Sequence, residues 1–172
     1  SLTFTQAVSS VVIKGGENFI GGKNAKAVFD CGTIVREGLG GTVNIPVSWA
    51  GGITAYANNA NTYGILGGWA LLNDAAFAKM DTTTRAVGQV SASSKATTDS
   101  WTDNAHILVT GGGTRTLGNV SPYSVRYNAA VTPAQTNDLN GATLTIKSGG
   151  LAVTSTSACK LANGKLRSGF GT

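Results

Sequence analysis

The chain has 172 residues, enough for one domain with a sizeable buried core. Only 12% of the residues are charged and 41% are hydrophobic, which argues against intrinsic disorder, because disorder goes with low hydrophobicity and high charge. The net charge of +5 comes from scattered Lys and Arg residues without interleaved aromatic residues, so nucleic-acid binding is not expected; nor is a transmembrane segment, because no apolar run is long enough.

Short extended segments separated by glycine corners occupy most of the first two thirds of the chain. The predicted strands are three to five residues long and lie at Leu2–Phe4, Val11–Lys14, Asn18–Ile20, Ala27–Phe29, Thr33–Val35, Val43–Val47 and Ile107–Thr110. One segment, Asn73–Met80, has a helical pattern, with Asn73 or Asp74 as the N-cap. It would span two turns at most.

The last third of the chain has the clearest strand pattern. Within each predicted strand apolar and polar residues alternate, so each strand has one dry face and one wet face. These strands lie at Ala142–Ile146, Leu151–Thr154, Cys159–Leu161 and Lys165–Arg167.

The pattern predicts a single all-β domain over residues 1–172, and two architectures remain open. Strands this short, joined by Gly-Gly and Ser-Gly-Gly corners, favour a β-solenoid, in which each coil adds one strand to each of several parallel sheets. The dipeptides Asn140-Gly141 and Asn163-Gly164 are typical of tight hairpins and favour the alternative, an antiparallel, pilin-like β-sandwich.

The run from Asp138 to Thr154 places a Leu-Asn-Gly turn before a Thr-Leu-Thr-Ile strand and a Ser-Gly-Gly corner before the next strand. A Gly-Lys-Leu-Arg-Ser-Gly step follows at Gly164–Gly169, and Gly67–Ala70 and Trp101–Asn104 add two tryptophan-containing segments upstream. Together these segments resemble passenger-type repeats of bacterial autotransporter-like surface proteins, most clearly over residues 139–169. The resemblance implies a β-solenoid outside the cell that serves adhesion, aggregation or surface coating.

No residue pattern supports a catalytic, metal or cofactor site, so we expect neither an enzyme nor a cofactor. His106 is the only histidine, no nucleophile elbow accompanies it, and the acids are not spaced as a catalytic pair. The two cysteines, Cys31 and Cys159, are too few for a zinc site. They are expected either to form a disulfide or to remain buried thiols.

The leading functional expectation is an extracellular structural protein that self-associates into a filament or surface coat and has an adhesive role. Chains would meet end to end through uncapped strand edges, or by donating a strand built on Leu2, Phe4, Val11 and Ile13 to a neighbour. The alternative is a glycan-binding adhesin or phage-like fibre module, and the third reading is a polysaccharide-degrading β-helix enzyme. Candidate ligand or interface aromatics are Trp49, Tyr56, Tyr63 and Tyr123.

Overall fold

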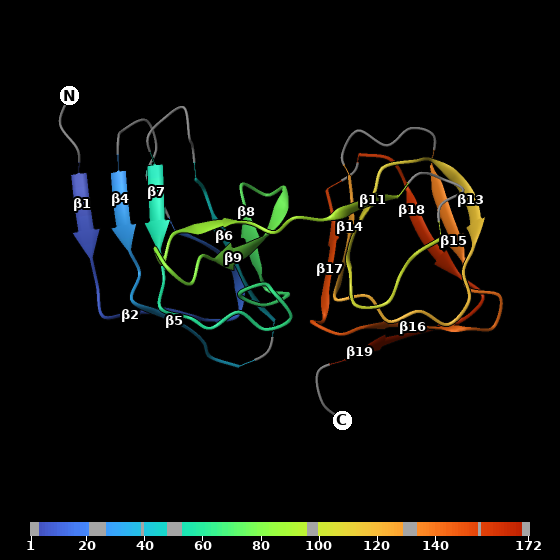
Figure 1. Ribbon diagram of the computed structural model, residues 1–172, viewed down its shortest axis with the longest axis horizontal. Coiled ribbons are helices and arrows are strands. Elements are labelled where there is room, and N and C mark those ends of the chain that lie inside the picture. The colour runs from blue at the N-terminus through green and yellow to red at the C-terminus, as the bar shows by residue number, and fades with distance from the viewer. Residues whose placement is uncertain are drawn as a thin grey trace. The chain divides into compact units, whose positions relative to one another are not determined.

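The computed structural model describes residues 4–20, 27–38, 40–47, 53–95, 100–128, 134–154 and 156–169 (Figure 1). The regular secondary structure of these residues is entirely β and forms a β-solenoid of about six turns, which confirms the predicted fold class. No helix among them is long and apolar enough to cross a membrane. Contacts divide the chain into two compact units, unit 1 (Ser1–Val90) and unit 2 (Ser91–Thr172). The single domain over residues 1–172 stays a prediction.

Unit 1 consists of three successive coils whose strands stack in parallel, with β1, β4 and β7 side by side (Figure 1). The first coil contributes one strand to each of three sheets, the second coil does the same, and the third contributes to two. The strands are β1 (Phe4–Ala7), β2 (Ser10–Ile13), β3 (Gly16–Phe19), β4 (Ala27–Asp30), β5 (Thr33–Arg36), β6 (Gly41–Ile45), β7 (Ile53–Tyr56) and β8 (Ala70–Leu72).

An antiparallel segment follows the third coil, where the sequence predicted a short helix. Asn73 and Asp74 both have positive φ, and the Ala75 amide donates to the Leu72 carbonyl at 3.0 Å, so the chain reverses in a tight turn. The turn leads into β9 (Ala76–Met80), which pairs with β8 and with β10 (Val87–Gln89). The helix prediction for Asn73–Met80 is therefore wrong. Ala76, Phe77 and Ala78 are consecutive and all buried, as in a strand covered on both faces.

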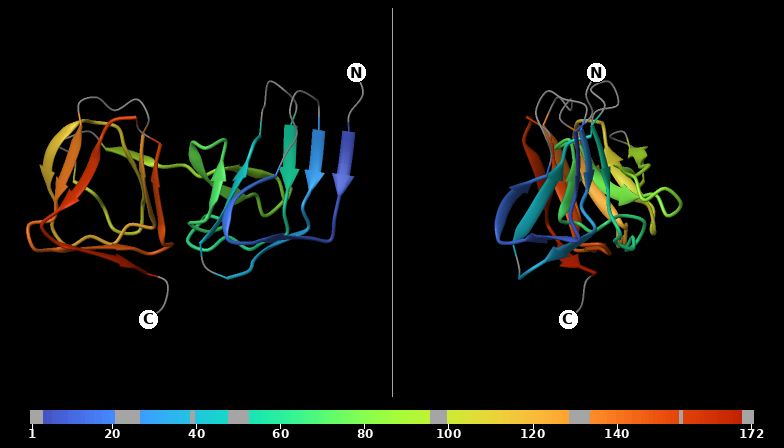
Figure 2. Two further views of the ribbon diagram at one scale, coloured as in Figure 1. Left: turned by 180° about the vertical axis from the view of Figure 1, so that it is seen from behind. Right: turned by 90° about the vertical axis from the view of Figure 1, so that its left-hand side faces the viewer.

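Unit 2 repeats the same arrangement with three further coils, in which the strands again stack in parallel (Figure 2). Its three sheets contain β11, β12, β14 and β17; β13, β15 and β18; and β16 with β19, which Val120 extends by one bridge. The strands are β11 (Ser93–Lys95), β12 (His106–Val109), β13 (Gly113–Thr116), β14 (Ser124–Tyr127), β15 (Gln135–Asp138), β16 (Thr143–Ile146), β17 (Gly150–Val153), β18 (Cys159–Ala162) and β19 (Lys165–Ser168).

The corners between strands explain why the sandwich alternative is wrong. Asn140 and Gly141 have φ of 46° and 81°, and the Ala142 amide donates to the Leu139 carbonyl at 2.7 Å. This tight turn joins β15 to β16, which belong to different sheets, so it turns a corner of the coil and closes no hairpin. At another corner, a Cβ on Gly32 would stand 2.1 Å from the Ser9 carbonyl oxygen of the coil before, a spacing that only glycine tolerates.

Each unit has its own hydrophobic interior, made of inward-facing residues stacked in register on successive coils. We call such a stack an inner column. In unit 1 the columns contain Ile34, Val43 and Ile45, and in unit 2 they contain Val125 and Leu144. The interior of unit 2 also holds polar side chains: Asn137 is buried and donates from Nδ2 to the Tyr127 hydroxyl at 2.8 Å. Burial raises the pKa of Tyr127, so this hydroxyl stays protonated.

Candidate functional site

The first coil, β1 to β3, leaves its inner columns open on one side. Phe4 is in register with the buried Ala27 of β4, and Val8 follows β1 at the level of the buried Cys31. Both therefore belong to inner columns, yet 58% of Phe4 and 43% of Val8 are exposed. The exposure arises because no further coil among the described residues covers this edge.

The last coil, β17 to β19, has a similar open edge. Val153 lies in register with the buried Tyr127, and Leu166 lies in register with the buried Leu144. These two terminal members of inner columns are 56% and 51% exposed. Leu151 ends a third column, above the buried Val125, and is also exposed. The last coil thus presents apolar side chains where the next coil of a solenoid would pack.

The other edge of each unit is closed by that unit's own residues. In unit 1, residues 81–86 cover the third coil: Ala86 forms a β-bridge with Tyr56, and the Ala57 amide donates a hydrogen bond to the Arg85 carbonyl at 3.1 Å. Ala55 and Ala57 of this coil are therefore buried. In unit 2, β11 pairs with β12, and Trp101 is buried in the cluster that contains Ile107. Each unit therefore has one closed and one open edge.

A polar cluster lies on neighbouring corners of unit 2. The Tyr123 and His106 rings are 5.4 Å apart, and the Lys147 ammonium lies 5.9 Å from the centre of the Tyr123 ring. His106 Nδ1 and Ser124 Oγ are hydrogen-bonded at 2.8 Å, and Lys147 Nζ donates to the Asn104 side chain. Backbone bonds fix the corners, with the Tyr123 amide donating to the Ala105 carbonyl at 2.8 Å. We call Asn104, His106, Tyr123 and Lys147 the corner cluster.

The other aromatic candidates do not join this cluster. Trp49 lies outside the described residues, as does Leu2 of the predicted donated strand. Tyr56 ends β7 in unit 1 and is half-buried, whereas Tyr63 is exposed and has positive φ in the turn at the Thr62–Ile65 bridge. Tyr56 and Tyr63 belong to unit 1, and Tyr123 belongs to unit 2.

The remaining donated-strand candidates already pair within their own chain. Phe4 belongs to β1, which pairs with β4, and Val11 and Ile13 belong to β2, which pairs with β5. Ile13 is buried and Val11 packs on the core of unit 1. Donation of this segment to a neighbouring chain stays a prediction.

Asparagine side chains in unit 1 take the place of missing strands, which sequence reasoning did not find. The Asn59 side chain accepts from the Ile34 amide at 2.8 Å and donates to the Ile34 carbonyl at 2.7 Å, as a paired strand would. Asn61 does the same for Met80, and Asn73 for Val47. In the polar loop between Tyr56 and Tyr63, the side-chain amides of Asn59 and Asn61 are therefore already engaged in hydrogen bonds within unit 1.

Both cysteines are free thiols in the structure, so the expected disulfide is not formed there. Cys31 is buried in unit 1, and burial, the largest cause, raises the pKa of its thiol. Cys159 is half-buried in β18 of unit 2. A bond between the two stays a prediction.

The charged side chains of the described residues include one close ion pair, in unit 1. Within the part of the chain that the structure describes, no three His, Cys, Asp or Glu side chains are grouped so that they could hold a metal ion. Asp30 and Arg85 form an ion pair at 2.6 Å in unit 1. The hydrogen bond from Arg85 lowers the pKa of Asp30, and the amide of Gly32 lowers it further.

Comparisons of the chain with models of known protein families, with curated protein sequences and with solved structures found no match. The β-solenoid itself is thus established by the structure, whereas the resemblance to autotransporter passenger repeats stays an expectation from the sequence.

Proposed function

We propose that this chain is an extracellular structural protein that self-associates into a filament or surface coat by stacking open coil edges of different copies. The observation that carries the proposal is the exposure of apolar inner-column residues at one edge of each unit, while the opposite edges are closed. A location at the cell surface and the passenger-type repeat resemblance belong to the same proposal.

Stacking would be driven by both side chains and backbone. Covering a half-exposed apolar side chain contributes about 1 kcal/mol to the free energy of association. Four side chains at the open edges are exposed to about this extent: Phe4, Val8, Val153 and Leu166. The edge strands of a sheet also carry unpaired amides and carbonyls that a neighbouring strand can satisfy. A further coil would cover the apolar side chains and pair the backbone amides and carbonyls at the same time. A globular partner with a convex surface would not do both.

Sedimentation velocity over a range of concentrations, followed by negative-stain imaging, tests the proposal with the 172-residue chain. We expect concentration-dependent assembly that Phe4→Lys abolishes, because stacking would bury an unpaired ammonium. Val12→Lys is the matched control: Val12 is also exposed, but it is in register with Val35, which remains exposed in the second coil although the first coil covers that coil. A wild-type chain that stays monomeric at its solubility limit overturns the proposal.

Glycan binding is a second candidate function, favoured by the corner cluster. An ammonium over an aromatic ring, beside an imidazole and an amide, provides a stacking face and a cation for an acidic sugar. Titration with an oligouronate followed by NMR is expected to shift Tyr123 and Lys147 signals, and Tyr123→Ala is expected to remove the effect. Tyr63→Ala, which changes an exposed tyrosine of unit 1, is the control. Equal shifts in both variants would exclude this role.

A further inference from the structure

The two open edges differ in charge although they share the same geometry. Each edge presents three strands of four residues, β1 to β3 on the first coil and β17 to β19 on the last. Residues 4–20 of the first coil contain one base and one acid, Lys14 and Glu17, and Lys23 and Lys26 follow in the sequence before β4 begins at Ala27. The last coil carries Lys160, Lys165 and Arg167, and no acid occurs after Asp138.

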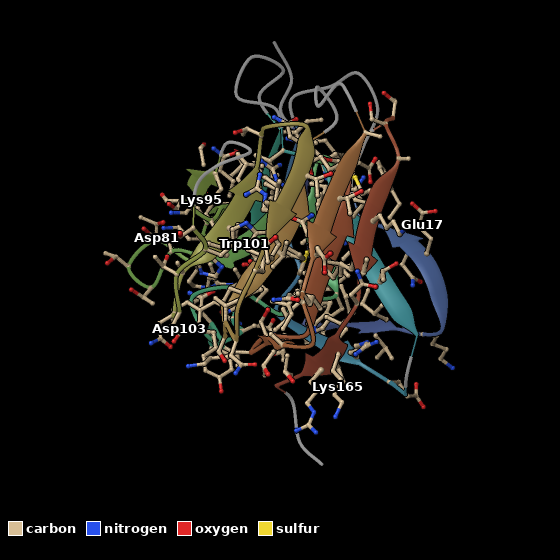
Figure 3. All side chains as sticks on the ribbon, turned by 90° about the vertical axis from the view of Figure 1, so that its right-hand side faces the viewer. Glu17, Asp81, Lys95, Trp101, Asp103 and Lys165 are labelled. Carbon is tan, nitrogen blue, oxygen red and sulfur yellow. The ribbon has the colours of Figure 1, made fainter. Side chains whose placement is uncertain are left out.

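The basic side chains of the last coil all face outward around its open edge. Lys160, Lys165 and Arg167 are exposed and alternate with the inner-column residues Leu161 and Leu166. Lys165 projects away from the ribbon in Figure 3, as does Glu17 of the first coil. The last coil therefore combines an apolar interior edge with a purely basic rim.

From this asymmetry we infer that copies stack head to tail, the first coil of one chain on the last coil of the next. The inference rests on the proposed self-association and specifies its polarity. Two last coils facing each other would bring two basic rims together, and like charges in an interface disfavour that pairing. The first coil, by contrast, carries an exposed acid, Glu17, with which a basic rim can pair.

The direction of the strands supports the same pairing. Throughout unit 2 each coil stacks on the next with parallel strands and continuous inner columns. Only a head-to-tail contact continues that parallel arrangement, because a two-fold contact between identical edges makes the facing strands antiparallel. A head-to-tail contact also leaves one edge of each kind open at the ends of the assembly. Growth can then continue beyond a dimer.

Two variants with complementary blocked edges test the polarity. A first-coil variant carries Phe4→Lys and Val8→Lys, and a last-coil variant carries Val153→Lys and Leu166→Lys; the four positions are exposed, so the isolated chains should fold. If stacking is head to tail, each variant alone is monomeric in sedimentation velocity. An equimolar mixture then forms a one-to-one dimer that does not grow, because each variant retains the edge that the other lacks.

Other outcomes overturn the inference and can be told apart from failure of the proposed function. Dimers of the first-coil variant alone would show last-coil to last-coil pairing, and dimers of the last-coil variant alone would show first-coil pairing. A mixture that stays monomeric while the wild type assembles also overturns the inference. A monomeric wild type overturns self-association itself. If circular dichroism shows that a double variant has lost its β signal, the single changes Val8→Lys and Leu166→Lys replace it.

Discussion

Replacing Asn59 by alanine removes the side chain that stands in for a strand in the third coil of unit 1. The substitution deletes the 2.8 Å bond from the Ile34 amide and the 2.7 Å bond to the Ile34 carbonyl. A typical internal hydrogen bond contributes about 1 kcal/mol, and a buried backbone group left without a partner costs roughly 1–3 kcal/mol. Because both groups belong to one residue at the edge of β5, we expect Asn59→Ala to lower the free energy of unfolding by about 2–4 kcal/mol.

Urea denaturation followed by far-ultraviolet circular dichroism measures this loss. Asn58→Ala is the matched control, because Asn58 is the preceding residue and its side chain is exposed. Surface substitutions of that kind usually change stability by less than about 0.5 kcal/mol. A loss for Asn59→Ala no larger than that of Asn58→Ala would refute the idea that the amide replaces a strand.

Two further predictions concern the Asp30–Arg85 ion pair and the two thiols. The hydrogen bond from Arg85 lowers the pKa of Asp30 below 3.8 in the folded state, so folding favours the ionised carboxylate. The ion pair therefore stabilises the folded protein above pH 3.8, and this stabilisation is lost as the pH falls through the pKa of Asp30 in the folded state. Asp30→Asn should therefore lower the thermal midpoint at neutral pH but not well below pH 3.8; an equal difference at both would contradict this. For the thiols, we expect Ellman's reagent to react with Cys159 readily and with Cys31 only after unfolding. If neither thiol reacts in urea without a reductant, the disulfide exists.

The all-β character and the solenoid could be predicted from the sequence because both depend on local signals. The spacing of short apolar runs places β4, β5, β16 and β17 within a residue or two of their positions in the structure. At Gly32 glycine is required because the backbones of neighbouring coils approach closely, so the sequence marks this corner with a glycine.

Segments whose burial depends on a neighbouring coil were not found in this way. β15 reads Gln-Thr-Asn-Asp and looks like a loop, yet Gln135 and Asn137 are buried because coils on either side enclose them. Asn59, Asn61 and Asn73 likewise look like loop residues, and only the fold brings them beside the backbone groups that they bind.

By itself, the sequence determined the type of structure and the position of most of its corners, because strand alternation and glycine turns are read over a few residues. Only the tertiary structure decided which edges are open. Phe4 and Ala27 are both inward-facing members of one column, and whether such a residue is exposed depends on whether a coil lies above it. The candidate assembly surfaces are therefore a property of stacking between distant segments, which no local pattern records.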